Sequence, residues 1–254
     1  MKKLILIICC ACLTMSVRAQ ENYLVVETDS LNFRSGPSAS SLSLTKFKKG
    51  EIVERIAQYD QFWVKVKYLG QEGYLSSKFL KPLSESEQYS SWTQVLTNTG
   101  ERLECSNITP MNDLSINNFL DIENASDGDA VVKLINSNDI CIRVAFIQQG
   151  GTYRIKNIPQ GIYTTKVAFG KRLSKSFKDD GVCYLKFLVN PEYKDYDTDR
   201  FDFFLKDGET EYRSDGVYKS TRVPSYSLRL YIERVFGRFQ KVGLDNISEQ
   251  EFNK

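Results

Sequence analysis

The 254-residue sequence predicts an all-β protein built from two units. Apolar and polar residues alternate with a period of two along most segments, as is typical of strands with one buried face. Turn residues interrupt these segments roughly every 8–12 residues. A polar, serine-rich stretch, LSESEQYSSW, divides the chain, so we expect a small unit before it and a larger one behind it.

Residues 1–19 have the composition of a secretory signal peptide. Lysines open the segment, about a dozen mostly apolar residues follow, and Val17 and Ala19 offer small side chains at a cleavage site before Gln20. The apolar run is shorter than the roughly 20 residues of a spanning helix, and no later segment is both long and apolar enough. We therefore expect an exported protein, periplasmic or extracellular, without a membrane span. The alternative is a lipoprotein modified at Cys12, which a cysteine at the −3 position of that motif disfavours.

Charge and composition exclude several classes of function. Removal of the signal peptide takes three of the 34 basic residues and none of the 32 acidic ones, leaving a net charge of −1. Such a chain has no global field to attract nucleic acid. The sequence contains no histidine, which excludes Ser-His-Asp and Cys-His hydrolysis and the common zinc sites that use imidazole. We expect no cofactor and no metal.

Three cysteines remain after the signal peptide: Cys105, Cys141 and Cys183. An exported chain meets an oxidising compartment, so one internal disulfide can form. The sequence leaves all three pairings open, as well as three buried free thiols.

The first unit, residues 20–82, contains short strands separated by turn residues. Gly70 lies in a predicted hairpin between two β-rich runs. Along residues 62–68, Val64 and Val66 are the natural core pair. The same parity places Phe62 and Tyr68 inward, and the alternate residues outward: Trp63, Lys65 and Lys67.

The motifs LNFRSGPS, KKGEIVE and FWVKVKYLGQEGYLSSKFLK follow one another over about 60 residues, and together they resemble the bacterial SH3 family. The resemblance implies a small SH3-like barrel that binds cell-wall peptide, that is peptidoglycan, or another envelope component. Carried over by position, the candidate ligand-binding residues are Arg34, Tyr59, Phe62, Trp63 and Tyr74. The structural alternative is that the aromatic residues serve as core and lid, and that Arg34 satisfies backbone groups of its loop. Trp63 ranks above the others because parity directs it outward.

Residues 83–92 read as a linker or as the first ordered turn of the larger unit, residues 93–242. Asp127-Gly128 and Asp207-Gly208 are hairpin signals. The stretch GGTYRIKNIPQGIYTTKVAFGKR, with its Pro-x-Gly turn, resembles Ig-like and transthyretin-like modules and implies a larger antiparallel Ig-like β-sandwich. Residues 243–254 form a tail, either a short capped helix or a loose polar end.

The segment 190–204 concentrates acidic residues that can, by chemistry alone, bind calcium or act on a glycosidic bond: Asp195, Asp197, Asp199 and Asp202. It lacks the glycine and the terminal glutamate of an EF-hand loop, and Lys194 and Arg200 would repel a cation. We therefore expect a solvated loop that leads into a strand.

Aromatic residues near the same segment offer flat faces for sugar rings: Tyr193, Tyr196, Phe201, Tyr212 and Tyr218. In a β-rich chain such residues also serve as core and strand filler. Residues 169–181 carry four basic side chains, which suit an anionic glycan or, as we expect, a solvated hairpin tip.

Three hypotheses of function follow. The first is a non-catalytic envelope protein whose SH3-like domain binds peptidoglycan or a protein partner while the sandwich makes a second contact. The alternative is a glycan-binding, adhesin-like protein with recognition on the sandwich. The third, a hydrolase that uses carboxylates or a Ser-Lys pair, is the weakest because no sharp catalytic motif is present.

Overall fold

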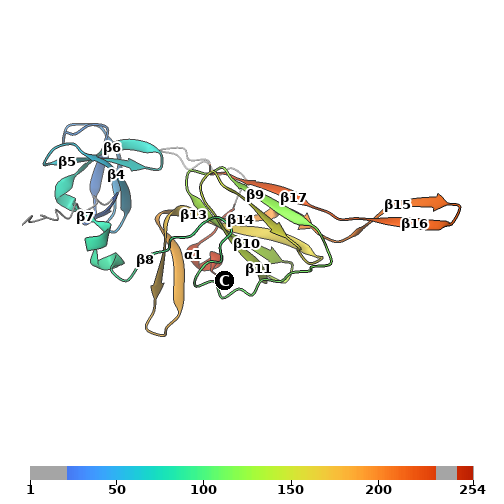
Figure 1. Cartoon of the computed structure of the whole chain (residues 1–254). Coiled ribbons are helices and arrows are strands. Elements are labelled where there is room, and N and C mark those ends of the chain that lie inside the picture. Colours follow the sequence, from blue (N-terminus) through green and yellow to red (C-terminus); the bar gives the residue numbers. More distant parts are fainter. Residues whose placement is uncertain (1–21, 233–244, 254) are drawn as a thin grey trace, which may run out of the picture.

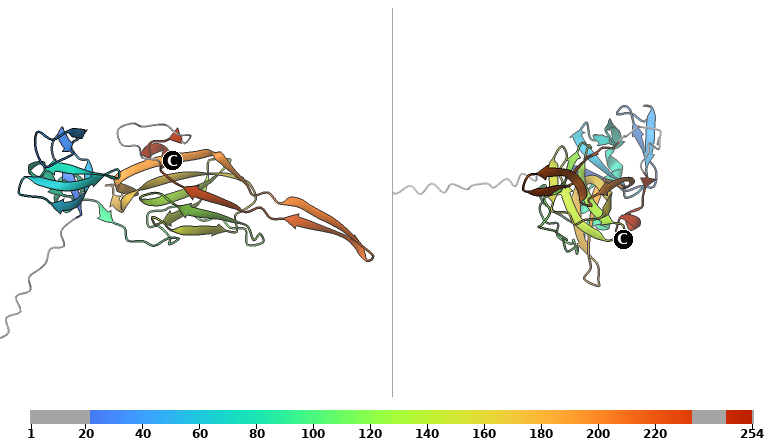
Figure 2. Two further views of the ribbon diagram at one scale, coloured as in Figure 1. Left: turned by 90° about the horizontal axis from the view of Figure 1, so that it is seen from above. Right: turned by 90° about the vertical axis from the view of Figure 1, so that its right-hand side faces the viewer.

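The computed structural model describes residues 22–232 and 245–253, so the expected signal peptide and the predicted sandwich boundary at residue 242 lie outside the described residues. Strands dominate the fold, and the all-β prediction is confirmed (Figure 1). A small front domain is followed by a larger domain of two stacked sheets and a projecting two-stranded arm (Figures 1 and 2).

The front domain is one coiled sheet with the strand order β3-β2-β6-β5-β4-β1-β7. Its elements have these bounds: β1 Tyr23–Val26, β2 Leu31–Arg34, β3 Ser43–Phe47, β4 Ile52–Gln58, β5 Trp63–Tyr68, β6 Gln71–Ser76, the 3₁₀ turn Ser77–Phe79 and β7 Leu80–Pro82. The strands surround one apolar core that includes Phe33, Phe47 and Leu75. Gly73 is required there because a Cβ at that position would lie 2.4 Å from the Phe33 ring.

The parity prediction for β5 is correct in its interior and wrong at its start. Val64 and Val66 are buried, and Tyr68 packs its ring edge against Phe47 with the centroids 4.6 Å apart. Phe62, predicted to point inward, is 62% exposed. The strand begins only at Trp63, so Phe62 belongs to the preceding turn, where the alternation of strand side chains does not apply.

The segment after Pro82 is ordered. It forms two 3₁₀ turns, Leu83–Glu85 and Glu87–Tyr89, before β8 (Thr93–Gln94) joins the larger domain. Leu83 packs in a small apolar cluster with residues of both domains: Val25, Ile52, Leu188 and Val189. The Lys171 ammonium pairs with the Glu54 carboxylate at 2.7 Å across the same junction. The two domains are therefore in direct contact.

The larger domain is a β-sandwich. One sheet has the order β11-β10-β13-β14-β18, with β8 added to β13, and the other has the order β12-β9-β17. The bounds are β9 Phe119–Asn124, β10 Asp129–Asn136, β11 Cys141–Ile147, β12 Thr152–Lys156, β13 Ile162–Phe177, β14 Cys183–Asp202, β17 Tyr226–Leu230 and β18 Asp245–Asn246. The facing sides share one core, to which every one of these strands except β8 and β18 contributes. The pairs are antiparallel except β17 with β9, which run parallel.

The three turn signals in the larger domain predicted hairpins, and none of the three positions is the turn of a hairpin. Asp127-Gly128 links β9 to β10, and Pro159–Gly161 links β12 to β13, but the strands of each pair belong to different sheets. The buried Asn124 amide holds the first of these crossings by donating to the carbonyls of Gly128 and Ile147, at 2.9 and 3.0 Å. Asp207-Gly208 lies inside a strand of the arm. A turn sequence reverses the chain locally, but it does not determine whether the next strand pairs in the same sheet or crosses to the other sheet.

The arm is the hairpin of β15 (Lys206–Arg213) and β16 (Gly216–Arg222), which turns at Ser214 and Asp215. It extends away from the sandwich (Figures 1 and 2) and almost all its side chains are exposed. Within the described residues, the two strands pair only with each other.

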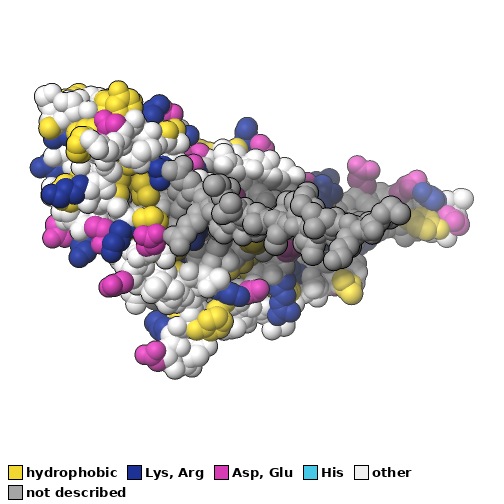
Figure 3. Space-filling model, turned by 60° about the vertical axis from the view of Figure 1, so that its left-hand side comes forward, with side chains coloured by type: hydrophobic (Ala, Val, Ile, Leu, Met, Phe, Trp, Pro, Cys, Tyr) yellow, Lys and Arg dark blue, Asp and Glu magenta, His cyan; other side chains and the backbone are white. Residues whose placement is uncertain are grey.

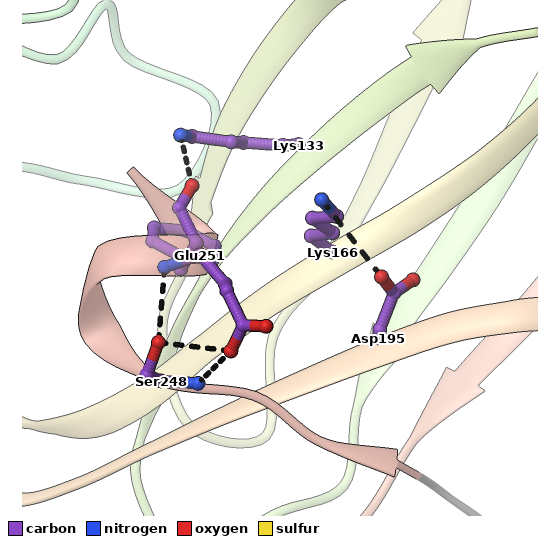
Figure 4. Close-up of polar contacts among 6 residues, drawn as sticks. Lys133, Lys166, Asp195, Ser248 and Glu251 are labelled. Carbon is purple, nitrogen blue, oxygen red and sulfur yellow. Dashed lines mark hydrogen bonds and ion pairs between the residues drawn. The ribbon is translucent and has the colours of Figure 1, made fainter. Parts of the chain in front are cut away.

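The outer face of the larger sheet is also covered. Leu103, Phe146, Leu173 and Phe187 form a second cluster there, which the C-terminal helix α1 (Glu249–Phe252) closes with its last residue. Ser248 and Glu251 form a capping box, and Lys133 donates to the carbonyl at the end of the helix (Figure 4). Of the two forms expected for the C-terminal end, the structure therefore shows the capped helix.

One disulfide, Cys105–Cys183, ties the segment before β9 to the start of β14, with a Cα–Cα distance of 5.2 Å. Cys141, on the edge strand β11, is free.

Candidate functional site

The outward face of the front domain gathers the sequence-predicted residues. Gly73 and Leu75 face the core, so Tyr74 between them projects outward from β6. Its register partners are Lys65 on β5 and Arg34 on β2. Figure 3 shows hydrophobic side chains at the surface of this domain, among charged ones.

Two tyrosine rings form the centre of this face. The rings of Tyr59 and Tyr74 meet edge to face with their centroids 5.5 Å apart. Tyr59 is 59% exposed, and Tyr74 is half-buried. Trp63 is half-buried on β5, opposite Ser76 and therefore diagonal to Tyr74. We call Tyr59, Trp63 and Tyr74 the aromatic platform.

The turn that carries Tyr59 and Phe62 is held rigidly. The Asp60 carboxylate accepts the backbone N–H groups of Phe62 and Trp63, at 2.7 and 2.8 Å. The backbone N–H of Tyr59 donates to the Trp63 carbonyl at 3.0 Å, and that of Ser77 to the Phe62 carbonyl at 2.9 Å. The exposed rings therefore project from a fixed backbone, which lowers the entropy cost of binding.

Arg34 fits its structural alternative. Its Nη1 donates to the Ser41 carbonyl at 2.7 Å and thereby closes the loop between β2 and β3. The side chain is partly buried, so it borders the aromatic platform as a loop-holding residue. A ligand contact from its remaining donors stays a prediction.

Two charged residues that the sequence did not single out as ligand contacts lie beside the platform. Lys65 and Glu72 pair at 2.6 Å on the outer face of β5 and β6. The hydrogen bond from Lys65 lowers the pKa of the Glu72 carboxyl, and the same bond raises the pKa of Lys65. The charges of this pair offset each other beside the aromatic platform, and Lys67 lies on the same face opposite Glu72. Strand parity is the signal that places both side chains outward.

The glycan surface suggested for the larger domain is not assembled as the sequence indicated. Tyr196 and Phe201 are buried between the two sheets, and Tyr193 packs on Phe252 with the ring centroids 5.5 Å apart. Only Tyr212 and Tyr218, both on the arm, are exposed.

The acidic and basic segments are also strands and not loops. Residues 190–202 are the second half of β14, paired with β13. Asp195 there lies 3.8 Å from the Lys166 ammonium (Figure 4), and the described chain holds no cluster of three metal-ligating side chains. Most of the basic stretch 169–181 belongs to β13, and the turn itself is confined to Lys178–Val182.

A family model for the bacterial SH3 domain matches residues 29–81. The match contains β2 to β6 and all five candidate residues, so the front domain is a bacterial SH3 domain, a class whose members are generally binding modules. No curated protein matches the chain. Because the family match ends before the sandwich, the Ig-like assignment of the larger domain stays a prediction. Within the two described ranges, none of the helices has the length and apolar character to cross a bilayer.

Proposed function

We propose that this chain is a non-catalytic, exported envelope protein whose SH3 domain binds cell-wall peptide, or an envelope protein, on the aromatic platform. The observation that carries the proposal is the edge-to-face pair of the exposed Tyr59 ring and the half-buried Tyr74 ring, with Tyr74 diagonal to Trp63 on the sheet. Tyrosine and tryptophan provide a large contact area with a polar end, and they dominate the energy of binding surfaces. The lack of histidine in the sequence agrees with a binding role.

The arm is the best candidate for the second contact. Tyr212 is 78% exposed, and Val217 and Tyr218 are exposed on the paired strand. An isolated two-stranded hairpin is marginally stable in water, and a partner along its length would stabilise it. We therefore assign the second interaction of the envelope protein to the arm and not to the larger sheet of the sandwich, both faces of which are covered.

Co-sedimentation of the predicted mature chain, residues 20–254, with purified peptidoglycan tests the proposal. We expect the double variant Tyr59→Ala/Tyr74→Ala to weaken binding by about tenfold or more, since each ring is expected to contribute on the order of 1 kcal/mol. Tyr231→Ala is the matched control, because it removes an exposed ring that lies outside both the aromatic platform and the arm. Equal binding by the double variant and the control would contradict the platform. If the wild-type chain itself stays in the supernatant, peptidoglycan is excluded as the ligand, and an envelope protein remains as the partner of the SH3 domain.

A further inference from the structure

A buried cation lies at the open edge of the sandwich. Arg143 is in the edge strand β11 and pairs in register with Leu134 of β10. Ala145 and Ile147, two and four residues further on, are buried opposite core residues of β10, so this side of β11 faces the interior. Arg143 thus enters the space between the sheets where an apolar residue is expected, and it is only 8% exposed.

The charge of Arg143 is not neutralised by any carboxylate of residues 22–232 and 245–253. Its Nη1 donates to the Ile142 carbonyl at 2.9 Å, and its Nη2 donates to the Asn112 side-chain carbonyl. Both acceptors are neutral. Burial lowers the pKa of the guanidinium, which nevertheless stays protonated because arginine titrates far above neutral pH. A buried cation without a counter-ion is costly, which makes the position unusual for a purely structural residue.

The guanidinium lines a half-open pocket of ≈ 270 Å³ between the edge strands β11 and β12. The wall from β12 adds Tyr153, Arg154 and Lys156. Arg154 is already paired with Asp121, through two hydrogen bonds of 2.6 Å. Lys156 has no partner among the described side chains, so two uncompensated positive charges, those of Arg143 and Lys156, border one small cavity.

We propose that this pocket binds a carboxylate group, held by Arg143 at its base and by Lys156 at its rim. A planar guanidinium matches a carboxylate in geometry, and the ionised pair forms stronger hydrogen bonds than the neutral acceptors that now surround it. The volume lies below that of pockets for whole drug-sized ligands, so the site suits one terminal group of a longer molecule. That molecule is a peptide with a free carboxylate or a sugar acid. The site is separate from the aromatic platform and does not depend on it.

Titration of the predicted mature chain, residues 20–254, followed by NMR of the arginine Nε–H groups and the backbone amides, tests the site. The probes are an N-acetylated dipeptide with a free carboxylate, the same dipeptide as its amide, glucuronate and inorganic phosphate. We expect saturable shifts at Arg143 and along β12 with the free dipeptide or with glucuronate, whichever is the source, and none with the amide. Shifts with the amide as large as with the acid, or with phosphate alone, would overturn the proposal.

Variants locate the binding energy. Arg143→Gln should weaken carboxylate binding by about tenfold or more, the loss expected for a charge-assisted hydrogen-bonded pair. Lys156→Gln, at an exposed position that does not endanger folding, should weaken it by roughly two- to fivefold. Arg102→Gln, at an exposed position outside both the pocket and the arm, is the matched control and should leave the affinity unchanged. The site can be tested even if Arg143→Gln fails to fold. It is contradicted if Lys156→Gln leaves the affinity for the carboxylate unchanged and if the Arg143 Nε–H signal of the wild-type chain does not move during the titration.

Discussion

The two domains use the same aromatic residue types in opposite ways. In the SH3 domain, Val, Leu and two phenylalanines fill the core, and Tyr59, Trp63 and Tyr74 remain on its outer face. In the sandwich, Tyr196 and Phe201 fill the core between the sheets. The difference follows from the number of covered faces. The coiled sheet of the SH3 domain buries one face, whereas the larger sheet of the sandwich is covered on both faces.

This comparison teaches that an aromatic residue indicates a binding surface only when its sheet has a free face. Clusters on both sides of β13 and β14 leave little room for exposed rings there. The arm escapes this rule because it projects beyond both layers (Figure 2). Exposed aromatic residues accordingly lie on the SH3 domain, as Tyr59 and Phe62 do, and on the arm, as Tyr212 and Tyr218 do, while Phe177, Phe204 and Tyr231 are exposed outside these two parts. The following predictions test the contrast between covered and free faces.

The largest effect is expected from a core aromatic of the sandwich. Phe201→Ala should lower the free energy of unfolding by about 3–5 kcal/mol, because it leaves a cavity between the sheets. Tyr218→Ala, on the exposed arm, should change it by no more than about 0.5 kcal/mol. Urea unfolding followed by circular dichroism measures both. Similar losses in the two variants would refute the division into covered and free faces.

The disulfide should stabilise the sandwich alone. Replacing both Cys105 and Cys183 with alanine should cost about 2–4 kcal/mol, because the bond closes a loop with a sequence separation of 78. The SH3 domain contains no cysteine, so its own unfolding transition should not respond to reductant. Cys141→Ala is the control for a thiol outside the bridge. Thermal unfolding with and without dithiothreitol gives the comparison, and an unchanged sandwich transition would show that the bridge contributes little.

Stability at alkaline pH should depend on the buried tyrosines of β14. Burial raises the pKa of Tyr193 and Tyr196 above the ordinary value of 10.0. Unfolded phenols therefore ionise first, so the free energy of unfolding is constant below about pH 10 and falls above it. The loss is at most about 1.4 kcal/mol per pH unit for each tyrosine.

Tyr196→Phe should reduce this alkaline loss and change stability little at pH 7, because no described group hydrogen-bonds to its hydroxyl. Tyr212→Phe, which removes the hydroxyl of an exposed ring on the arm, is the matched control. Urea unfolding between pH 7 and pH 11.5 makes the test. If the Tyr196→Phe profile is parallel to that of the wild type, the hydroxyl does not titrate with unfolding.

The smallest effect concerns the cover on the outer face of the larger sheet. Ser248→Ala removes one half of the capping box and should cost about 1 kcal/mol. Ser248→Asp, which keeps a capping acceptor, should restore most of that loss. Hydrogen exchange of the buried backbone amides of β13 and β14 should quicken in the alanine variant if α1 protects that face. No change in exchange would indicate that the helix is a dispensable cover.

Much of the front domain could be predicted from local patterns. The alternation in β5 identified Val64 and Val66, and the three motifs identified an SH3 domain. The prediction failed at Phe62, where the strand had not yet begun. In the larger domain the lengths of two strands were underestimated, because β13 and β14 run on through the segments 169–181 and 190–204, which were expected to be a hairpin tip and a loop. The pairing of the strands at the turn signals was also wrong. Pairing along a long neighbouring strand overrides such local signals.

By itself the sequence determined that this chain is built of strands, that it divides near Pro82 and that imidazole chemistry is excluded, since composition and two-residue periodicity are local properties. Tertiary structure alone decided that Cys105 pairs with Cys183, that Tyr196 is core and Tyr212 is not, and that Arg143 enters the interior without a carboxylate partner among residues 22–232 and 245–253. These outcomes depend on which sheet faces which, and contacts between residues far apart in the chain leave no periodic trace in its sequence.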